Sequence, residues 1–170
     1  MIRIPAGKIQ LWPDFTLHVP HEITLLEGGI YHLSGRNGSG KSSLMRKFLL
    51  EYQSDTPVYR IYVEQQMNTQ LYALRAMAAF DKTRQRITCE EDAVEYLLND
   101  LQQCLAMEPR PVWVFVDESR FLPRIITYPA ITRGSSLLVY CSHDAVISGS
   151  EELVCSPVDK ANSELRYVHH

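Results

Sequence analysis

The chain has 170 residues, of which 45% are hydrophobic and 22% charged, with a formal net charge of −3. This length suits one domain that buries its own core, and no apolar run approaches the roughly 20 residues that a membrane helix requires. The small negative charge and the lack of a Lys/Arg cluster argue against a primary nucleic-acid surface. We therefore expect a single domain over residues 1–168.

The cysteines and the first residues bear on the cellular compartment. The four cysteines show no C-x-x-C spacing, which favours reduced thiols that serve in packing over a zinc site. The N-terminal residues lack the long apolar core of a secretory signal. We expect a cytoplasmic protein.

The first predicted element is an antiparallel hairpin. Apolar and polar residues alternate over 9–11 and again over 15–19, on either side of the turn at 12–14.

The next stretch is typical of a phosphate-binding loop. Residues 35–43 fit G-x-x-x-x-G-K-[ST], in which backbone N–H groups point at the phosphates and glycines allow a close approach. An apolar run at 30–33 predicts a buried strand before the loop. Residues 42–50 predict a helix after it, with Leu44 and Phe48 on its inner side, Leu49 as a further candidate there, and its N-terminal end facing the anion. The candidate nucleotide-binding residues here are Gly35, Arg36, Asn37, Gly38, Ser39, Gly40, Lys41, Ser42 and Ser43.

Further apolar stretches predict strands at 57–63, 112–116 and 137–141. Strands that alternate with helices imply an α/β fold with a mostly parallel sheet and ligands at its carboxyl edge. The last stretches, at 152–155 and 165–168, predict a closing pair of edge strands.

Between residues 66 and 110 the chain is polar and helical. Its apolar residues recur at helical spacing and predict a helix that covers the sheet. They are Val94, Leu97, Leu98, Leu101 and Leu105.

Two acids follow the strand at 112–116 directly. Asp117 and Glu118 are costly to desolvate at the end of a buried strand unless a cation or a water network satisfies them. This is the form of a Walker B strand. Asp117 would then help Ser42 to hold Mg²⁺, and Glu118 would polarise the attacking water. The alternative is that the pair caps the next turn.

Polar residues also follow two other strands. His143, in the run Ser-His-Asp at 142–144, offers one donor and one acceptor for a γ-phosphate and a water. Gln65, after the strand at 57–63, is placed to touch both Mg²⁺ and water. The alternatives are that His143 is an ordinary surface or core histidine, and that Gln66 rather than Gln65 is the functional glutamine.

In chain order these motifs resemble those of ABC ATPases, the nucleotide-binding subunits of ABC transporters and their soluble relatives. The matching stretches are the P-loop at 35–44, the Q-loop at 62–65, the Walker B motif at 116–118 and the H-loop at 142–144. The resemblance implies a P-loop NTPase core, with a reduced helical insertion at 66–110, that binds ATP and Mg²⁺. It gives Lys41, Gln65, Glu118 and His143 catalytic roles, and Ser42, Asp117 and Gln65 roles as metal ligands.

The family also places an aromatic residue against the adenine, before the P-loop. Trp12 stands at a comparable place, with Phe15 as the substitute. An indole face against adenine is a plausible stacking contact. The alternative is that Trp12 only anchors the hairpin.

The chain departs from the family in the signature Leu-Ser-Gly-Gly-Gln, which should precede the helix that leads to Walker B. Residues 87–92 read Ile-Thr-Cys-Glu-Glu-Asp instead, where Thr88 and Glu91 fit a capping box. Ser-Arg-Phe-Leu at 119–122 also replaces the family's usual sequence after Walker B. Because family members hold ATP between one subunit's P-loop and the other's signature, a symmetric ATP-sandwich homodimer is doubtful.

Three functions are open at this point. The leading expectation is an ATPase of low basal activity that drives or switches a partner protein. The partner would be either a membrane permease or a second ATPase chain. If the partner is a permease, the ATPase would lie at the inner face of a membrane. The second is a small-molecule kinase, whose phosphates Arg120, Arg124 and Arg133 would contact. The third is a nucleotide-dependent assembly module with little hydrolysis. Glu118 and His143 favour hydrolysis.

Overall fold

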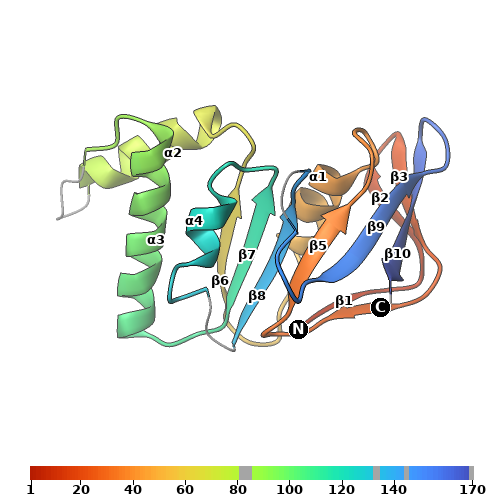
Figure 1. The fold of residues 1–170 in the computed structure, drawn as a ribbon, viewed down its shortest axis with the longest axis horizontal. Helices are drawn as coiled ribbons and strands as arrows, with labels where there is room; N and C mark the ends of the chain where they lie inside the picture. Colours follow the sequence, from red (N-terminus) through yellow and green to blue (C-terminus); the bar gives the residue numbers. More distant parts are fainter. Residues whose placement is uncertain (81–85, 132–134, 144–145, 169–170) are drawn as a thin grey trace.

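The computed structural model describes residues 1–80, 86–131, 135–143 and 146–168. Its centre is an eight-stranded mixed sheet with the strand order β2-β3-β10-β9-β5-β8-β7-β6 (Figure 1). The strands are β2 (Gly7–Trp12), β3 (Phe15–Val19), β5 (Ile30–Ser34), β6 (Tyr59–Val63), β7 (Val112–Asp117), β8 (Ser136–Cys141), β9 (Glu151–Pro157) and β10 (Asn162–Val168).

Most strand pairs in this sheet are parallel. Among the described strands of this eight-stranded sheet, only the pairs β2–β3 and β9–β10 run antiparallel. The predicted α/β fold with a mostly parallel sheet and an N-terminal antiparallel hairpin is therefore confirmed.

The helices are α1 (Lys41–Leu44), the π-helical turn η1 (Met45–Leu49), α2 (Asn68–Phe80), α3 (Glu90–Met107) and α4 (Leu122–Ile126). Within the described ranges, none is long and apolar enough to cross a membrane.

The strand β7, which lies between β8 and the edge strand β6, is buried along its whole length, because structure covers both faces of the sheet at this point. Its side chains alternate between the faces with period 2. Val112, Val114 and Val116 face one core. Trp113 and Phe115 face the other. Burial of one such side chain contributes about 1.5–3 kcal/mol, so both layers hold the carboxyl end of β7 in place.

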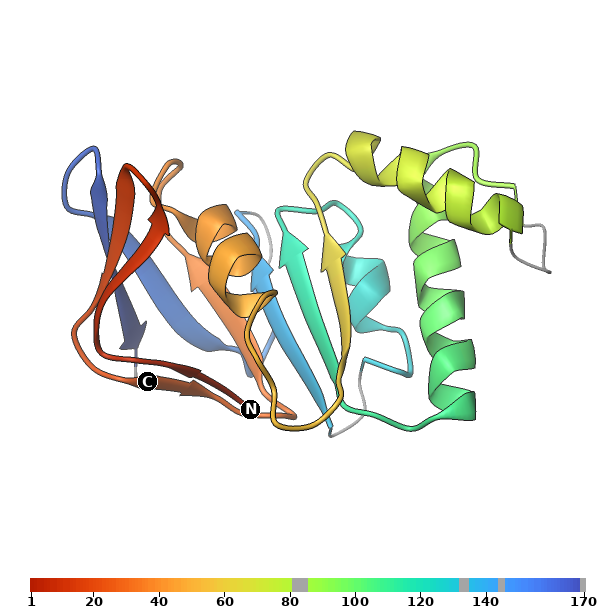
Figure 2. The same ribbon diagram turned by 180° about the vertical axis from the view of Figure 1, so that it is seen from behind.

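On one face of the sheet lie α1 and η1 (Figure 2). Leu44, Met45 and Leu49 are fully buried in this core, whereas Phe48 is half-buried. The predicted helix after the loop is confirmed. Leu44 and Leu49 are buried as expected, Phe48 packs against the same core while half-buried, and Met45 is a further buried residue.

A two-stranded ribbon, β1 (Ile2–Ile4) and β4 (Ile23–Leu25), closes the same core. The sequence pattern did not predict it, because three-residue strands are too short to show a period.

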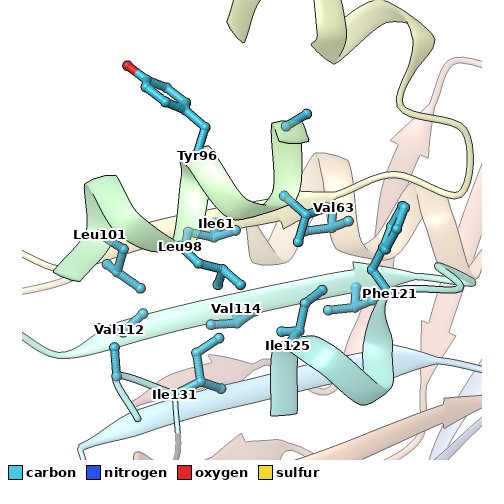
Figure 3. Close-up of a cluster of buried hydrophobic side chains, with 14 of the residues drawn as sticks. Ile61, Val63, Tyr96, Leu98, Leu101, Val112, Val114, Phe121, Ile125 and Ile131 are labelled. Atoms are coloured by element: carbon cyan, nitrogen blue, oxygen red, sulfur yellow. The ribbon is translucent and has the colours of Figure 1, made fainter. Parts of the chain in front are cut away.

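The other core lies between the sheet and the helices α3 and α4 (Figure 3). Two helices, α2 and α3, lie in the described residues of the segment 66–110, and α3 is the predicted covering helix. Val94, Leu98, Leu101 and Leu105 are buried as expected, and Leu97 is half-buried.

The expectation that the last two strands close the sheet as an edge pair is wrong. β9 lies between β10 and β5, and β10 pairs with β3, so the described edges are β2 and β6. β9 and β10 do pair antiparallel, as the pattern indicates. The position of a pair within a sheet depends on long-range pairing, which local alternation does not encode.

The expected cap of the covering helix is also shifted by one residue. The N-cap of α3 is Cys89, and Asp92 rather than Glu91 closes the capping box. Asp92 Oδ2 accepts hydrogen bonds from Thr88 N at 2.8 Å, Thr88 Oγ1 at 2.6 Å and Cys89 N at 3.3 Å.

Candidate functional site

The glycine-rich loop at 35–43, called the 35–43 loop from here on, joins the buried strand β5 to α1. Gly35 has φ 140°, and a Cβ there would lie 2.1 Å from the carbonyl oxygen of Cys155 on β9. Gly40, with φ 93°, stands directly before α1. A side chain at Gly35 would clash with backbone and strain the chain, so only glycine lets the loop lie this close to the sheet.

Lys41 is the buried cation of the loop, with 7% of its side chain exposed. Its Nζ donates hydrogen bonds to the carbonyl oxygens of Gly35, at 2.8 Å, and Arg36, at 3.1 Å. The ammonium thus lies inside the curve of the loop, where its charge and the backbone N–H groups favour an anion.

The two acids at the end of β7 have different surroundings. Asp117 is 5% exposed, and its Oδ2 accepts a hydrogen bond from the Tyr62 hydroxyl at 3.0 Å. Glu118 Oε1 lies 3.8 Å from Lys41 Nζ and 3.0 Å from His143 Nε2. The carboxylate of Glu118 therefore stands between the loop cation and the imidazole.

The backbone of Glu118 is strained. Its φ of 48° makes it the one positive-φ residue other than glycine among the described residues. Such a conformation costs about 1–3 kcal/mol and persists where surrounding structure imposes it. Here the Glu118 N–H donates to the carbonyl of Cys141 on β8, at 3.1 Å, which holds the turn.

The predicted residues meet around a cavity of about 460 Å³ at the carboxyl edge of the sheet. Its lining residues are Trp12, Phe15, Asn37, Gly38, Gly40, Lys41, Ser42, Ser43, Gln65 and Glu118. A second cavity of about 350 Å³ adjoins it, since Gln65 and Glu118 line both, and His143 lines the second. Gln66 lines neither cavity, so the geometry favours Gln65.

Five predicted residues lie outside the lining of the first cavity, and one of them, His143, lines the second. Arg36 is exposed, whereas Ser39 and Asp117 are buried beside it, and Gly35 forms the base of the loop. A larger cavity, of about 690 Å³, lies between residues 20–24 and 165–167 and is lined by none of the predicted site residues. We place the site at the smaller cavity because the buried lysine, the strained glutamate and the histidine converge there.

Two aromatic residues border the 35–43 loop. Trp12 is 41% exposed, its Nε1 donates to Ser43 Oγ at 2.9 Å, and Lys47 Nζ lies 4.5 Å from the centre of the indole ring. Phe15 packs on Gly40, where a Cβ would meet its ring. Trp12 is too exposed to serve as a buried hairpin anchor.

The arginines that a kinase would use are held by carboxylates of α3. Arg120 Nη2 donates to Glu90 Oε2 at 3.0 Å and Glu91 Oε1 at 2.9 Å. Arg124 Nη2 donates to Glu95 Oε2 at 2.9 Å. Glu90 and Glu91 therefore bind Arg120. Both stretches were named above as departures from the ABC pattern. Arg133 and Asp144 lie outside the described residues.

One group of residues near the acids was missed by the sequence analysis. Arg46 Nε donates to the Tyr62 hydroxyl at 2.8 Å, and Arg46 Nη2 donates to Glu64 Oε1 at 3.1 Å. Burial raises the pKa of Tyr62 well above its ordinary value, so the hydroxyl keeps its proton. The only sign of this group in the sequence is Tyr62 itself, three residues before Gln65. A tyrosine at that place indicates only a strand residue.

The donor set for a divalent cation consists of oxygens. No group of three or more His, Cys, Asp or Glu side chains within the described ranges is placed to hold a metal ion. The predicted set, the Ser42 hydroxyl, the Asp117 carboxylate and the Gln65 amide, is of the kind that Mg²⁺ takes together with phosphate oxygens and water.

A comparison of the chain with models of known protein families found no match, and neither did a comparison with curated proteins.

Proposed function

We propose that the chain is a MgATP-binding ATPase of ABC type with a P-loop NTPase core, which acts on a partner protein such as a membrane permease or a second ATPase chain. One observation carries the proposal. Glu118 Oε1 lies within 3.8 Å of the buried Lys41 ammonium and 3.0 Å from His143 Nε2, beside a glycine-rich loop that opens a helix. A cation, a base and an imidazole at one phosphate-binding loop are the groups that nucleotide hydrolysis requires.

The 35–43 loop would hold the phosphates with its backbone N–H groups and with the Lys41 ammonium. At present Lys41 is bound to two loop carbonyls, which are neutral acceptors. A phosphate is a stronger acceptor because charge-assisted hydrogen bonds are roughly twice as strong as neutral ones. The lysine is therefore already in the loop where it would be needed.

Ser42, Asp117 and Gln65 would hold Mg²⁺, which neutralises charge on the phosphate oxygens when bound. Glu118 would accept a proton from the attacking water. Its carboxylate is 19% exposed at the shared wall of the two cavities, so water can reach it. His143 would hold Glu118 in this orientation through the 3.0 Å contact.

The ion pairs of two arginines weaken the kinase alternative. Arg120 and Arg124 are paired with acids of α3 and are not held free for a second substrate. Hydrolysis therefore remains the proposed reaction. If the chain binds ATP but does not hydrolyse it, the result would support the nucleotide-dependent assembly module instead.

The test is phosphate release from ATP with no added acceptor. Glu118→Gln is expected to keep ATP binding and to slow release about 10²- to 10⁴-fold, because it removes a positioned general base. Glu108→Gln serves as the control, since Glu108 pairs with Arg110 outside both cavities. Equal release by Glu118→Gln and the parent would remove Glu118 from the mechanism.

The same variant addresses the oligomeric state. Glu90, Glu91 and Asp92 stand where the family's signature binds the partner's γ-phosphate, and acids facing a polyanion in a closed interface cost several kcal/mol. Glu118→Gln mixed with MgATP should show no ATP-driven dimer by light scattering. An ATP-dependent homodimer would contradict this expectation.

A further inference from the structure

Three side chains form a connected network beside the candidate metal ligand Asp117. Arg46 comes from η1, Tyr62 from β6, and Glu64 from the segment just after β6. The hydrogen bonds run from Arg46 to Glu64 and to Tyr62, and from Tyr62 to Asp117, over distances of 2.8–3.1 Å. The Arg46 guanidinium also lies 5.3 Å from the centre of the Tyr62 ring.

The direction of these bonds follows from the chemistry of the groups. An arginine only donates, so the Tyr62 oxygen is the acceptor in its bond with Arg46. The single phenol hydrogen is then free to point at Asp117 Oδ2, which accepts it as a carboxylate. One oxygen of Asp117 is thereby committed to Tyr62, and the rotation of the carboxylate is fixed.

The network also separates the arginine charge from Asp117. A guanidinium bound directly to the carboxylate would neutralise it and compete with a metal ion. Arg46 acts through a neutral phenol instead, and its own charge is balanced by Glu64 at 3.1 Å. Asp117 is thus held in place while it keeps its negative charge, which is what a hard cation such as Mg²⁺ requires.

We propose that Tyr62, oriented by Arg46, is a positioning residue that sets the Asp117 carboxylate for the divalent cation bound with ATP. This inference rests on the proposed function. Groups that hydrogen-bond a metal ligand commonly change metal affinity 10- to 100-fold when they are removed. The π turn η1 gives the loop helix a part in metal binding, because it carries Arg46 to Tyr62.

The experiment measures ATP affinity by calorimetry over a series of free Mg²⁺ concentrations and in EDTA. Tyr62→Phe keeps the ring and removes the hydroxyl. It is expected to bind ATP like the parent in EDTA, and to need about 10-fold more Mg²⁺ for the half-maximal gain in affinity. Arg46→Gln should shift the requirement in the same direction by less, because it leaves the phenol in place but no longer orients it.

Tyr59→Phe is the matched control. Tyr59 lies on the same strand, and its hydroxyl donates to the carbonyl of Cys104, at 3.4 Å, rather than to Asp117. Suppose that the ATP affinity of the parent responds to Mg²⁺, but that Tyr62→Phe and Arg46→Gln have the same Mg²⁺ requirement as the parent. This result would overturn the inference and leave the proposed function standing. A parent that binds no ATP, or whose affinity ignores Mg²⁺, would overturn both the inference and the corresponding part of the proposed function.

Discussion

Lys41 begins α1, whereas Glu118 and His143 follow the ends of β7 and β8, and Glu118 lies within ion-pair distance of both Lys41 and His143. Lys41 could be selected from the glycine-rich pattern, and Glu118 and His143 could be selected because each follows a buried strand closely. The strain at Glu118 could not be predicted, since φ at one residue is set by the turn after β7 and by the bond to Cys141. Tyr62 and Arg46 were missed because their roles depend on a contact across strands.

Trp12 provides a test at the scale of one residue. It borders the candidate nucleotide cavity and is 41% exposed, whereas Trp113 is fully buried inside β7. ATP should therefore change the emission of Trp12 and leave that of Trp113 nearly unchanged. Trp12→Phe is expected to lose most of the fluorescence change but to keep most of the affinity, because phenylalanine still stacks on adenine. A signal of parental size in Trp12→Phe would move the aromatic contact away from Trp12.

At the scale of elements, strands and helices follow their periodic patterns, but their exact starts do not. The run Thr-Cys-Glu-Glu-Asp at 88–92 offers two overlapping capping frames, and the pattern alone favours Thr88 with Glu91. In the structure Asp92 accepts bonds from Thr88 and Cys89, while Glu91 binds Arg120. The contact of Glu91 with Arg120 is tertiary, and no local pattern contains it.

The two capping frames differ in which substitution should destabilise the fold. The frame with Thr88 and Glu91 predicts a loss of stability in Glu91→Gln, and the observed frame with Cys89 and Asp92 predicts it in Asp92→Asn. Hydrogen bonds from Thr88 lower the pKa of Asp92 from 3.8 to about 2. A lowered pKa means that this carboxylate stabilises the fold above about pH 4 and loses its effect as the pH falls through about 2. Asp92→Asn should therefore lower the melting temperature at pH 7, with a smaller difference from the parent near pH 2. Glu91→Gln, the control, should change it less; an equal loss in both variants at pH 7 would contradict the observed frame.

At the scale of the whole molecule, the parallel strands bring four distant segments to one edge of the sheet. The 35–43 loop, Gln65, Glu118 and His143 lie around two adjoining cavities there. That edge was predictable, because parallel strands point their carboxyl ends the same way. The network of Tyr62 and the pairing of Arg120 with α3 were not, since both depend on strand order and on how the helices pack.

The proposal as a whole depends on whether the 35–43 loop binds ATP through Lys41. Calorimetry with ATP and Mg²⁺ should show binding by the parent and by Lys160→Ala, whose lysine lies outside the cavities. Lys41→Ala should lose at least about 30-fold in affinity, since truncating a buried partner of an anion costs about 2–5 kcal/mol. Equal ATP affinity in Lys41→Ala and the parent, or no ATP binding by the parent, would contradict the account.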